Sequence, residues 1–215
     1  MKPGDRLSLF GRGQGEWEAV LQEIRKREVV LQVAQQTRPA SAGTGLVVCF
    51  APIKGGRLET IIEKATELGA SVLQPVITHR TIVDKVNGER AEAIAREAAE
   101  QCERVDWPEI REPVKLLKLL GDWPEGLPLI YGDESGGSAS ITALAAPDTA
   151  EGWAILVGPE GGFTPEEFQA LQRVKAARGV GLGPRILRAD TAVIALATLT
   201  LAAWGDWQER PRFLS

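Results

Sequence analysis

From Leu46 to the C-terminus, short apolar runs alternate with stretches of helical periodicity, and this alternation limits the possible folds more than any other feature of the sequence. A strand covered by helices on both faces has apolar residues in succession, whereas a strand with one wet face alternates apolar and polar residues. Strands that alternate with helices pair side by side in a parallel sheet. The sequence therefore predicts an α/β fold with a parallel sheet, whose strands are Leu46–Ala51, Val72–Ile77, Leu127–Tyr131, Trp153–Val157 and Val180–Leu182.

The stretches between these runs have the spacing and the end signals of helices. Arg57–Leu68 has apolar residues at helical spacing and is followed by Gly69, and Glu89–Cys102 is rich in Ala and Glu. A helix is also predicted over Pro165–Arg178, because Thr164 is a good N-cap residue and proline is favoured at the first helical position.

The last predicted helix, Asp190–Trp204, is apolar almost all round. A helix of this kind must be covered on every side. Burial within its own domain satisfies this requirement, and so does an interface with a second subunit. The pattern favours the two arrangements about equally.

The N-terminal segment has a different pattern, which indicates a small β domain. Asp5–Phe10 and Glu16–Leu21 alternate apolar and polar residues on both sides of a Gly-rich turn, as in a β-hairpin. Glu28–Ala34 adds a third strand, and Pro39–Gly45 is a linker of small residues. Three strands are too few to be stable alone, so this piece either packs on the main domain or belongs to a larger β domain. We predict a β domain over residues 1–42 and an α/β domain over residues 43–215.

Composition excludes several classes of protein. The longest apolar stretch, Ala192–Trp204, would span about 20 Å as a helix, short of the roughly 30 Å of a membrane core. The N-terminus lacks the apolar segment of a signal peptide, so we expect a cytoplasmic protein with no membrane partner. The net charge of −4 argues weakly against a general nucleic-acid binder, although residues 1–40 carry seven Lys and Arg against five Asp and Glu.

Cysteine and histidine are too few to build a metal site. Cys49 and Cys102 are expected to be reduced thiols, and with the single histidine, His79, they cannot form a zinc site by themselves. We therefore predict no metal. His79 is more typical of a loop or a helix cap than of a general base.

The loops that follow the predicted strands are the candidate binding elements, because ligands of open α/β sheets bind beyond the carboxyl ends of the strands. Three of these loops are rich in glycine or arginine: 132–137, 158–165 and 183–191. Glycine lets a backbone approach a ligand, although a tight strand-to-helix turn also explains the glycines of the second loop. The chain lacks a P-loop, a nucleophile elbow and the spacing of a dinucleotide fingerprint, so an NAD-dependent enzyme is disfavoured.

Four linked motifs in these regions resemble the RsmE family of bacterial 16S ribosomal RNA uridine-N3 methyltransferases, which belong to the SPOUT class. The motifs are Lys54–Glu59 with Lys64–Gly69, Glu100–Cys102 with Arg104, Leu156–Gly162, and Leu182–Arg188 with Thr191 and Ala192. The resemblance runs from about Leu46 to the C-terminus. It implies a SPOUT-type parallel sheet with a C-terminal deep trefoil knot, bound S-adenosylmethionine, and a homodimer formed through the knot domain and the C-terminal helix. It also implies that the substrate is 16S rRNA in the assembled small ribosomal subunit.

The resemblance also assigns roles to residues. It implies that the cofactor is held by Tyr131, Glu134, Gly158, Pro159, Glu160, Gly161, Gly162, Leu182, Gly183, Ile186, Leu187 and Thr191. Arg188 and Arg185 follow the last glycine loop and are the predicted catalytic residues, since either can hydrogen-bond a uracil oxygen or an RNA phosphate. We favour Arg188 for the reacting base. The alternative is a structural ion pair of Arg188 with Asp190 or Glu160.

The N-terminal segment resembles a truncated PUA-like β domain of the same family. Its expected RNA contacts are Arg6, Arg12, Arg25, Lys26 and Arg27. Members of the family have a further strand before the Gly4-Asp5 turn. The alternative function is therefore an RNA-associated module that binds S-adenosylmethionine but has weak or no activity. No residue of the sequence is identified as the general base.

Overall fold

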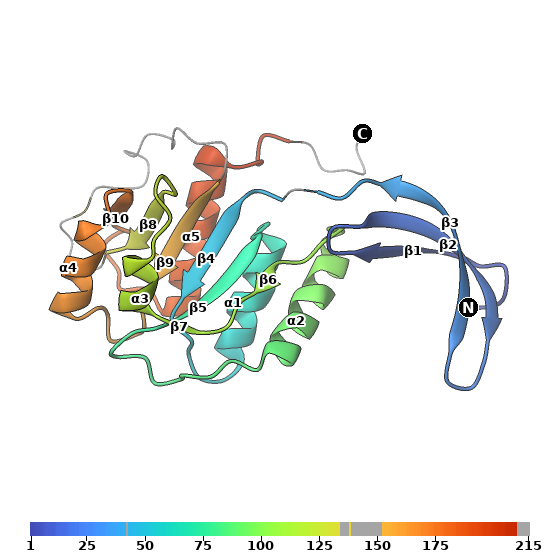
Figure 1. Cartoon of the computed structure of the whole chain (residues 1–215), viewed down its shortest axis with the longest axis horizontal. Helices are drawn as coiled ribbons and strands as arrows, with labels where there is room; N and C mark the ends of the chain where they lie inside the picture. Colours follow the sequence, from blue (N-terminus) through green and yellow to red (C-terminus); the bar gives the residue numbers. More distant parts are fainter. Residues whose placement is uncertain (42, 134–137, 139–151, 210–215) are drawn as a thin grey trace. The chain divides into compact units, whose positions relative to one another are not determined.

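The computed structural model describes residues 1–41, 43–133, 138 and 152–209 (Figure 1). Contacts divide the chain into two compact units. The first comprises Met1–Ala42 and Ala99–Trp107, and the second comprises Gly43–Ala98 and Pro108–Ser215. Each unit is described by itself.

The first unit contains an antiparallel sheet of three strands in the order β1-β2-β3. These strands are β1 (Arg6–Gly11), β2 (Gly15–Ile24) and β3 (Val29–Arg38). The predicted hairpin and third strand are thus confirmed, and β3 continues four residues beyond the predicted end. Gly15 has a φ of 74°, and a Cβ there would lie 2.3 Å from the carbonyl oxygen of Arg38. Only glycine fits where the end of β3 passes this closely.

The second unit contains a parallel sheet, and this confirms the predicted α/β class. Its strands follow the order β10-β8-β9-β4-β5-β6, with β7 also paired to β5 (Figure 1). Their bounds are β4 (Leu46–Phe50), β5 (Val72–Ile77), β6 (Glu109–Ile110), β7 (Val114–Lys115), β8 (Leu129–Gly132), β9 (Trp153–Val157) and β10 (Ala177–Val180). The strands β6 and β7 were not predicted, because two residues are too few to show a periodicity.

Helices cover both faces of this sheet. They are α1 (Gly56–Glu67), α2 (Gly88–Gln101), α3 (Leu116–Gly121), α4 (Pro165–Arg173) and α5 (Ala189–Trp204). In β9, Leu156 belongs to a core cluster with Leu116 of α3 and Leu171 of α4, whereas the ring of Trp153 meets that of Trp204 in α5. Trp153 and Leu156 are three positions apart and so point to opposite faces of the strand. Consequently α3 and α4 cover one face, and α5 covers the other.

The beginning of α4 is as predicted, but its end is not. The Thr164 hydroxyl accepts the Glu167 N–H and the Glu167 carboxylate accepts the Thr164 N–H, which completes a capping box. The helix ends at Arg173 instead of Arg178, and the next residues form β10 beside β8. The predicted strand Val180–Leu182 is therefore displaced toward the N-terminus. Ala and Lys favour a helix here, but pairing with β8 prevails over that local preference.

Candidate functional site

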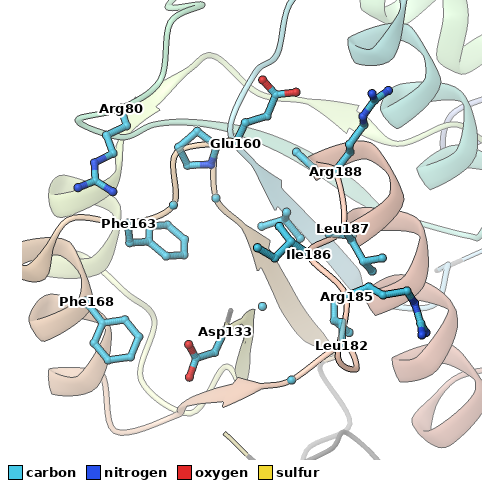
Figure 2. A pocket seen from close by; sticks show the side chains of 18 of the residues that line it. Arg80, Asp133, Glu160, Phe163, Phe168, Leu182, Arg185, Ile186, Leu187 and Arg188 are labelled. Atoms are coloured by element: carbon cyan, nitrogen blue, oxygen red, sulfur yellow. The ribbon is translucent and has the colours of Figure 1, made fainter. Parts of the chain in front are cut away.

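A pocket of about 860 Å³ opens at the carboxyl edge of the parallel sheet, where the loops after β8, β9 and β10 meet (Figure 2). These strands are direct neighbours in the sheet, so their loops emerge side by side. The lining comprises Arg80, Gly132, Asp133, Val157, Gly158, Pro159, Glu160, Gly162, Phe163, Thr164, Pro165, Phe168, Gly181, Leu182, Gly183, Pro184, Arg185, Ile186, Leu187, Arg188, Ala189 and Ala192.

The loop after β9 folds back on itself and forms one wall of the pocket. A Cβ at Gly158 would lie 2.9 Å from Cζ of Phe163, so the phenyl ring occupies the space that a side chain would need. The Gly162 N–H donates to the Pro159 carbonyl at 2.8 Å, and Gly162 has a φ of 69°. Glycine at position 158 therefore makes room for the Phe163 ring, and glycine at position 162 adopts the positive φ without strain.

The loop after β10 forms the opposite wall, which is apolar. In Figure 2, Leu182, Ile186 and Leu187 face Phe163 and Phe168 across the cavity. Ile186 is 86% exposed at the mouth of the pocket, so its apolar surface is available to a ligand or to another chain. The wall is suited to a flat, partly apolar ligand.

Arg185 and Arg188 lie at the rim of the pocket. In Figure 2 both extend away from the apolar wall, Arg188 on the same side as Glu160 and Arg185 on the other. Glu160 pairs with Arg57 at 2.7 Å, and the buried Oδ1 of Asp190 has no hydrogen-bond partner among the described residues. The alternative of a structural ion pair with Arg188 is therefore not found in the described part of the chain.

Three of the described residues predicted to hold the cofactor, Tyr131, Gly161 and Thr191, lie outside the lining. Tyr131 is buried, and its ring meets edge to face that of the lining residue Phe168, with ring centres 6.0 Å apart. Burial and the nearby charge of Asp133 raise the pKa of Tyr131. Gly161 is in the middle of the loop after β9 but does not line the pocket, and Thr191 is exposed on α5. A further predicted cofactor residue, Glu134, lies outside the described residues.

Several lining residues were missed at the level of sequence. Phe168 lies one helical turn after the N-cap Thr164, and this spacing is a signal that could have found it. Asp133 follows β8 and accepts a hydrogen bond from the Ser138 hydroxyl at 2.5 Å. Arg80 comes from the loop after β5, which lies two strands away from β9, so no local pattern placed it here.

The predicted RNA contacts lie on the first unit, and three of them have partners there. Arg6 pairs with Glu18 at 3.1 Å, and Arg25 pairs with both Glu23 and Glu28. The guanidinium of Arg12 lies 5.3 Å from the ring centre of Trp107 and donates to its carbonyl. Lys26 and Arg27 are exposed in the turn between β2 and β3. These five residues remain predicted RNA contacts.

The other groups singled out in the sequence lie away from the pocket. His79 is exposed, does not line the pocket, and donates its backbone N–H to Glu167. Cys49 is buried, Cys102 is exposed, and neither forms a disulfide bond. In residues 1–41, 43–133, 138 and 152–209, no cluster of His, Cys, Asp and Glu is suited to a metal ion, and no helix is long and apolar enough to cross a membrane.

Comparison with known proteins places this pocket in a wider context. Residues 41–201 match a family model described as an RNA methyltransferase domain. The chain is 32% identical over 202 residues to ribosomal RNA small subunit methyltransferase E of Rickettsia conorii, covering 94% of this chain and 82% of that protein. The same enzyme of Bacillus subtilis is 32% identical over 208 residues, which are 89% of this chain and 79% of the relative.

Solved structures of methyltransferases are also similar to this chain. The methyltransferase Lpg2936 of Legionella pneumophila, in complex with the bound cofactor SAM, is 31% identical with a TM-score of 0.81. A ribosomal RNA small subunit methyltransferase E of Neisseria gonorrhoeae, bound to S-adenosyl methionine, is 26% identical with a TM-score of 0.85. Each comparison covers 96% of this chain and 86% of the other.

Proposed function

Because the chain belongs to the RNA methyltransferase family, and within it to the ribosomal RNA small subunit methyltransferase E proteins, we propose that it methylates N3 of one uridine in 16S rRNA of the assembled small subunit. It is an S-adenosylmethionine-dependent rRNA methyltransferase. The observation that carries the finer proposal is the meeting of three loops, those after β8, β9 and β10, around one pocket.

The residues of this pocket fit S-adenosylmethionine. Its volume of about 860 Å³ is in the range of small-molecule sites. The backbone of Gly158 and Gly162 can hydrogen-bond the adenine and the ribose, while Leu182, Ile186 and Leu187 provide an apolar surface for the ring. When bound there, the cofactor supplies a methyl group activated by a positively charged sulfur.

Arg188 and Arg185 are the proposed catalytic residues. Uracil N3 carries a proton and is a poor nucleophile until that proton leaves, after which the negative charge spreads onto the two uracil oxygens. A guanidinium that donates to one of these oxygens stabilises the anion and orients N3 toward the methyl group. With the N3 proton passed to water, the N3–C bond would form as the S–C bond breaks, and the electron pair of the broken bond would stay on sulfur. Arg188 is assigned to the reacting base, and Arg185 to the same base or to a neighbouring phosphate.

A homodimer is part of the same proposal. The side of α5 that faces away from the sheet bears Ile194, Ala195 and Leu199, which are only half-buried. A second copy of the chain would cover this apolar side. The C-terminal trefoil knot and the PUA-like character of the β1–β3 sheet are proposed from the family resemblance. The division at residues 42 and 43 is proposed from the linker of small residues, Pro39–Gly45.

Transfer of a labelled methyl group from S-adenosylmethionine to unmodified small subunits tests this function. We expect label on one uridine N3, mapped by mass spectrometry, and a loss of at least about 100-fold in rate for Arg188→Ala. Arg96→Ala, which removes an exposed arginine of α2, is the matched control and should label normally. If the wild type binds S-adenosylmethionine but labels no RNA, the alternative of a binding module is correct.

A further inference from the structure

We propose that Arg80 is a positioning residue, which fixes the backbone of the loop Gly158–Phe163 in the shape that binds S-adenosylmethionine. This inference rests on the proposed function. It concerns a contact between two loops that lie 81 residues apart in the sequence. Three sets of interactions carry it.

The first set makes the Arg80 loop rigid. Thr78 and Thr81 close a tight turn directly after β5. The Thr78 N–H donates to Thr81 Oγ1 at 3.0 Å, the two hydroxyl groups are 2.8 Å apart, and the Thr81 N–H donates to the Thr78 carbonyl at 3.2 Å. With three hydrogen bonds across four residues, the backbone of Arg80 has little freedom to move.

The second set ties this turn to the beginning of α4. Glu167 is only 4% exposed, and both of its carboxylate oxygens accept backbone N–H groups. Oε1 accepts from His79 at 2.7 Å and Oε2 accepts from Thr164 at 2.8 Å. Hydrogen bonds to a buried carboxylate are strong. Residues 79 and 164 are therefore held at a fixed separation.

The third set is made by the Arg80 side chain itself. Its Nη1 donates to the Gly161 carbonyl at 2.5 Å. A Cβ at Gly161 would lie 3.3 Å from Arg80 Cδ, so the side chain packs directly against the glycine. Between β9 and the Glu167 anchor, this contact holds the middle of the loop. The only ion pair of the loop among the described residues, Arg57 with Glu160, is exposed and contributes little.

A loop that already has its binding conformation loses less conformational entropy when the ligand binds, so the ligand binds more tightly. We expect Arg80→Ala to raise the Kd for S-adenosylmethionine about 10-fold, the loss of one charge-assisted hydrogen bond. The kcat at saturating cofactor should change less than about threefold. Arg80→Lys should recover much of the affinity, because an ammonium group can donate to the same carbonyl.

Isothermal titration calorimetry with S-adenosylmethionine and hydrogen exchange of residues 158–164 measure these effects. Arg90→Ala is the matched control, since Arg90 is an exposed arginine that pairs with Glu59 on α1, and it should leave the Kd unchanged. Exchange of the Gly162 and Thr164 amides in the free protein should be faster in Arg80→Ala than in the wild type.

Gly161→Ala provides an independent test in the same assay. The added methyl group should press against Arg80 in the wild type and weaken binding, but should have a smaller effect in the Arg80→Ala background. If the effects of Gly161→Ala and Arg80→Ala on the free energy of S-adenosylmethionine binding are additive, the two residues are not in contact.

The outcomes separate this inference from the proposed function. If the wild type does not bind S-adenosylmethionine, the proposed function fails. If the wild type binds it and Arg80→Ala binds equally well, or if Arg80→Ala lowers only RNA binding or kcat, Arg80 is not a positioning residue of this loop. Equal weakening by Arg80→Ala and Arg80→Lys also overturns the inference.

Discussion

Single side chains in this protein differ in how far their chemistry depends on burial, and the two cysteines are the clearest case. Cys49 in β4 is buried, and burial raises its pKa from the ordinary value of 9.0 to about 12. Cys102 is exposed. A thiol reagent should therefore modify Cys102 and leave Cys49 unmodified in the folded protein.

The same pKa gives stability a dependence on pH. Above about pH 9 the Cys49 thiol ionises in the unfolded chain but stays protonated in the folded chain, so the unfolded chain binds fewer protons. The contribution of Cys49 to the free energy of unfolding should fall by about 1.4 kcal/mol per pH unit between pH 9 and about pH 12. Urea denaturation at pH 8, 9 and 10 measures the slope.

The free energy of unfolding of Cys49→Ala should fall less steeply with pH than that of the wild type, whatever the stability of the variant at neutral pH. Cys102→Ala is the control, and its slope should match the wild type. Identical slopes in Cys49→Ala and wild type would show that Cys49 ionises equally in both states.

Arg188 illustrates what the sequence could establish about a single residue. Its place after the last glycine loop predicted a position near the ligand, and it does line the rim of the pocket. The sequence did not show that Glu160 pairs with Arg57 instead of Arg188. Arg57 and Glu160 are 103 residues apart, so only the folded chain brings them together.

At the scale of elements, the loop between β9 and α4 depends on the close contact of Gly158 with the Phe163 ring. Gly158→Ala would place a Cβ 2.9 Å from the ring of Phe163, and such a distance forces the ring to move. Because the ring forms part of the pocket wall, we expect the Kd for S-adenosylmethionine to rise at least about 10-fold, measured by calorimetry.

Gly88→Ala at the start of α2 is the matched control. A Cβ there meets nothing within 4 Å and the φ is not positive, so both stability and cofactor binding should be retained. Equal Kd values of Gly158→Ala and the wild type for S-adenosylmethionine would show that this loop is not part of the proposed cofactor site. A variant Gly158→Ala with Phe163→Leu should recover part of the affinity, because leucine leaves more room.

Elements that have strong local signals were predicted, and those without them were not. The ranges of β5 and β9 match the predicted ranges, because each is a run of mostly apolar residues with clear ends. The strands β6 and β7 and the six-residue α3 were missed. The end of α4 was placed too late, because pairing of β10 with β8 is a contact between segments far apart in the sequence.

At the scale of the whole molecule, α5 poses the main question. An α-helix with apolar residues all round is unusual on a surface, and its outer side is only half-buried in a single chain. Sedimentation velocity at micromolar concentration should give a dimer for the wild type. Leu199→Glu, which places a charge on that outer side, should give a monomer.

Leu117→Glu is the matched control. Leu117 lies on α3 and is also partly exposed, so a charge there should leave the dimer intact. A monomeric wild type would contradict the proposed interface. A monomer that appears only with Leu199→Glu would place the interface on α5.

The sequence by itself determined the features that neighbouring residues control. Apolar runs, helical spacing, the Thr164 cap and the glycine loops depend on contacts within a few residues, and they predicted the α/β class and three of the loops that line the pocket. Only the tertiary structure decided the lateral order of the strands, since parallel neighbours are not neighbours in sequence. The strand order decides which loops meet, and it brings Arg80 into contact with Gly161. These residues are 81 positions apart in the sequence, so a local sequence pattern does not predict their contact.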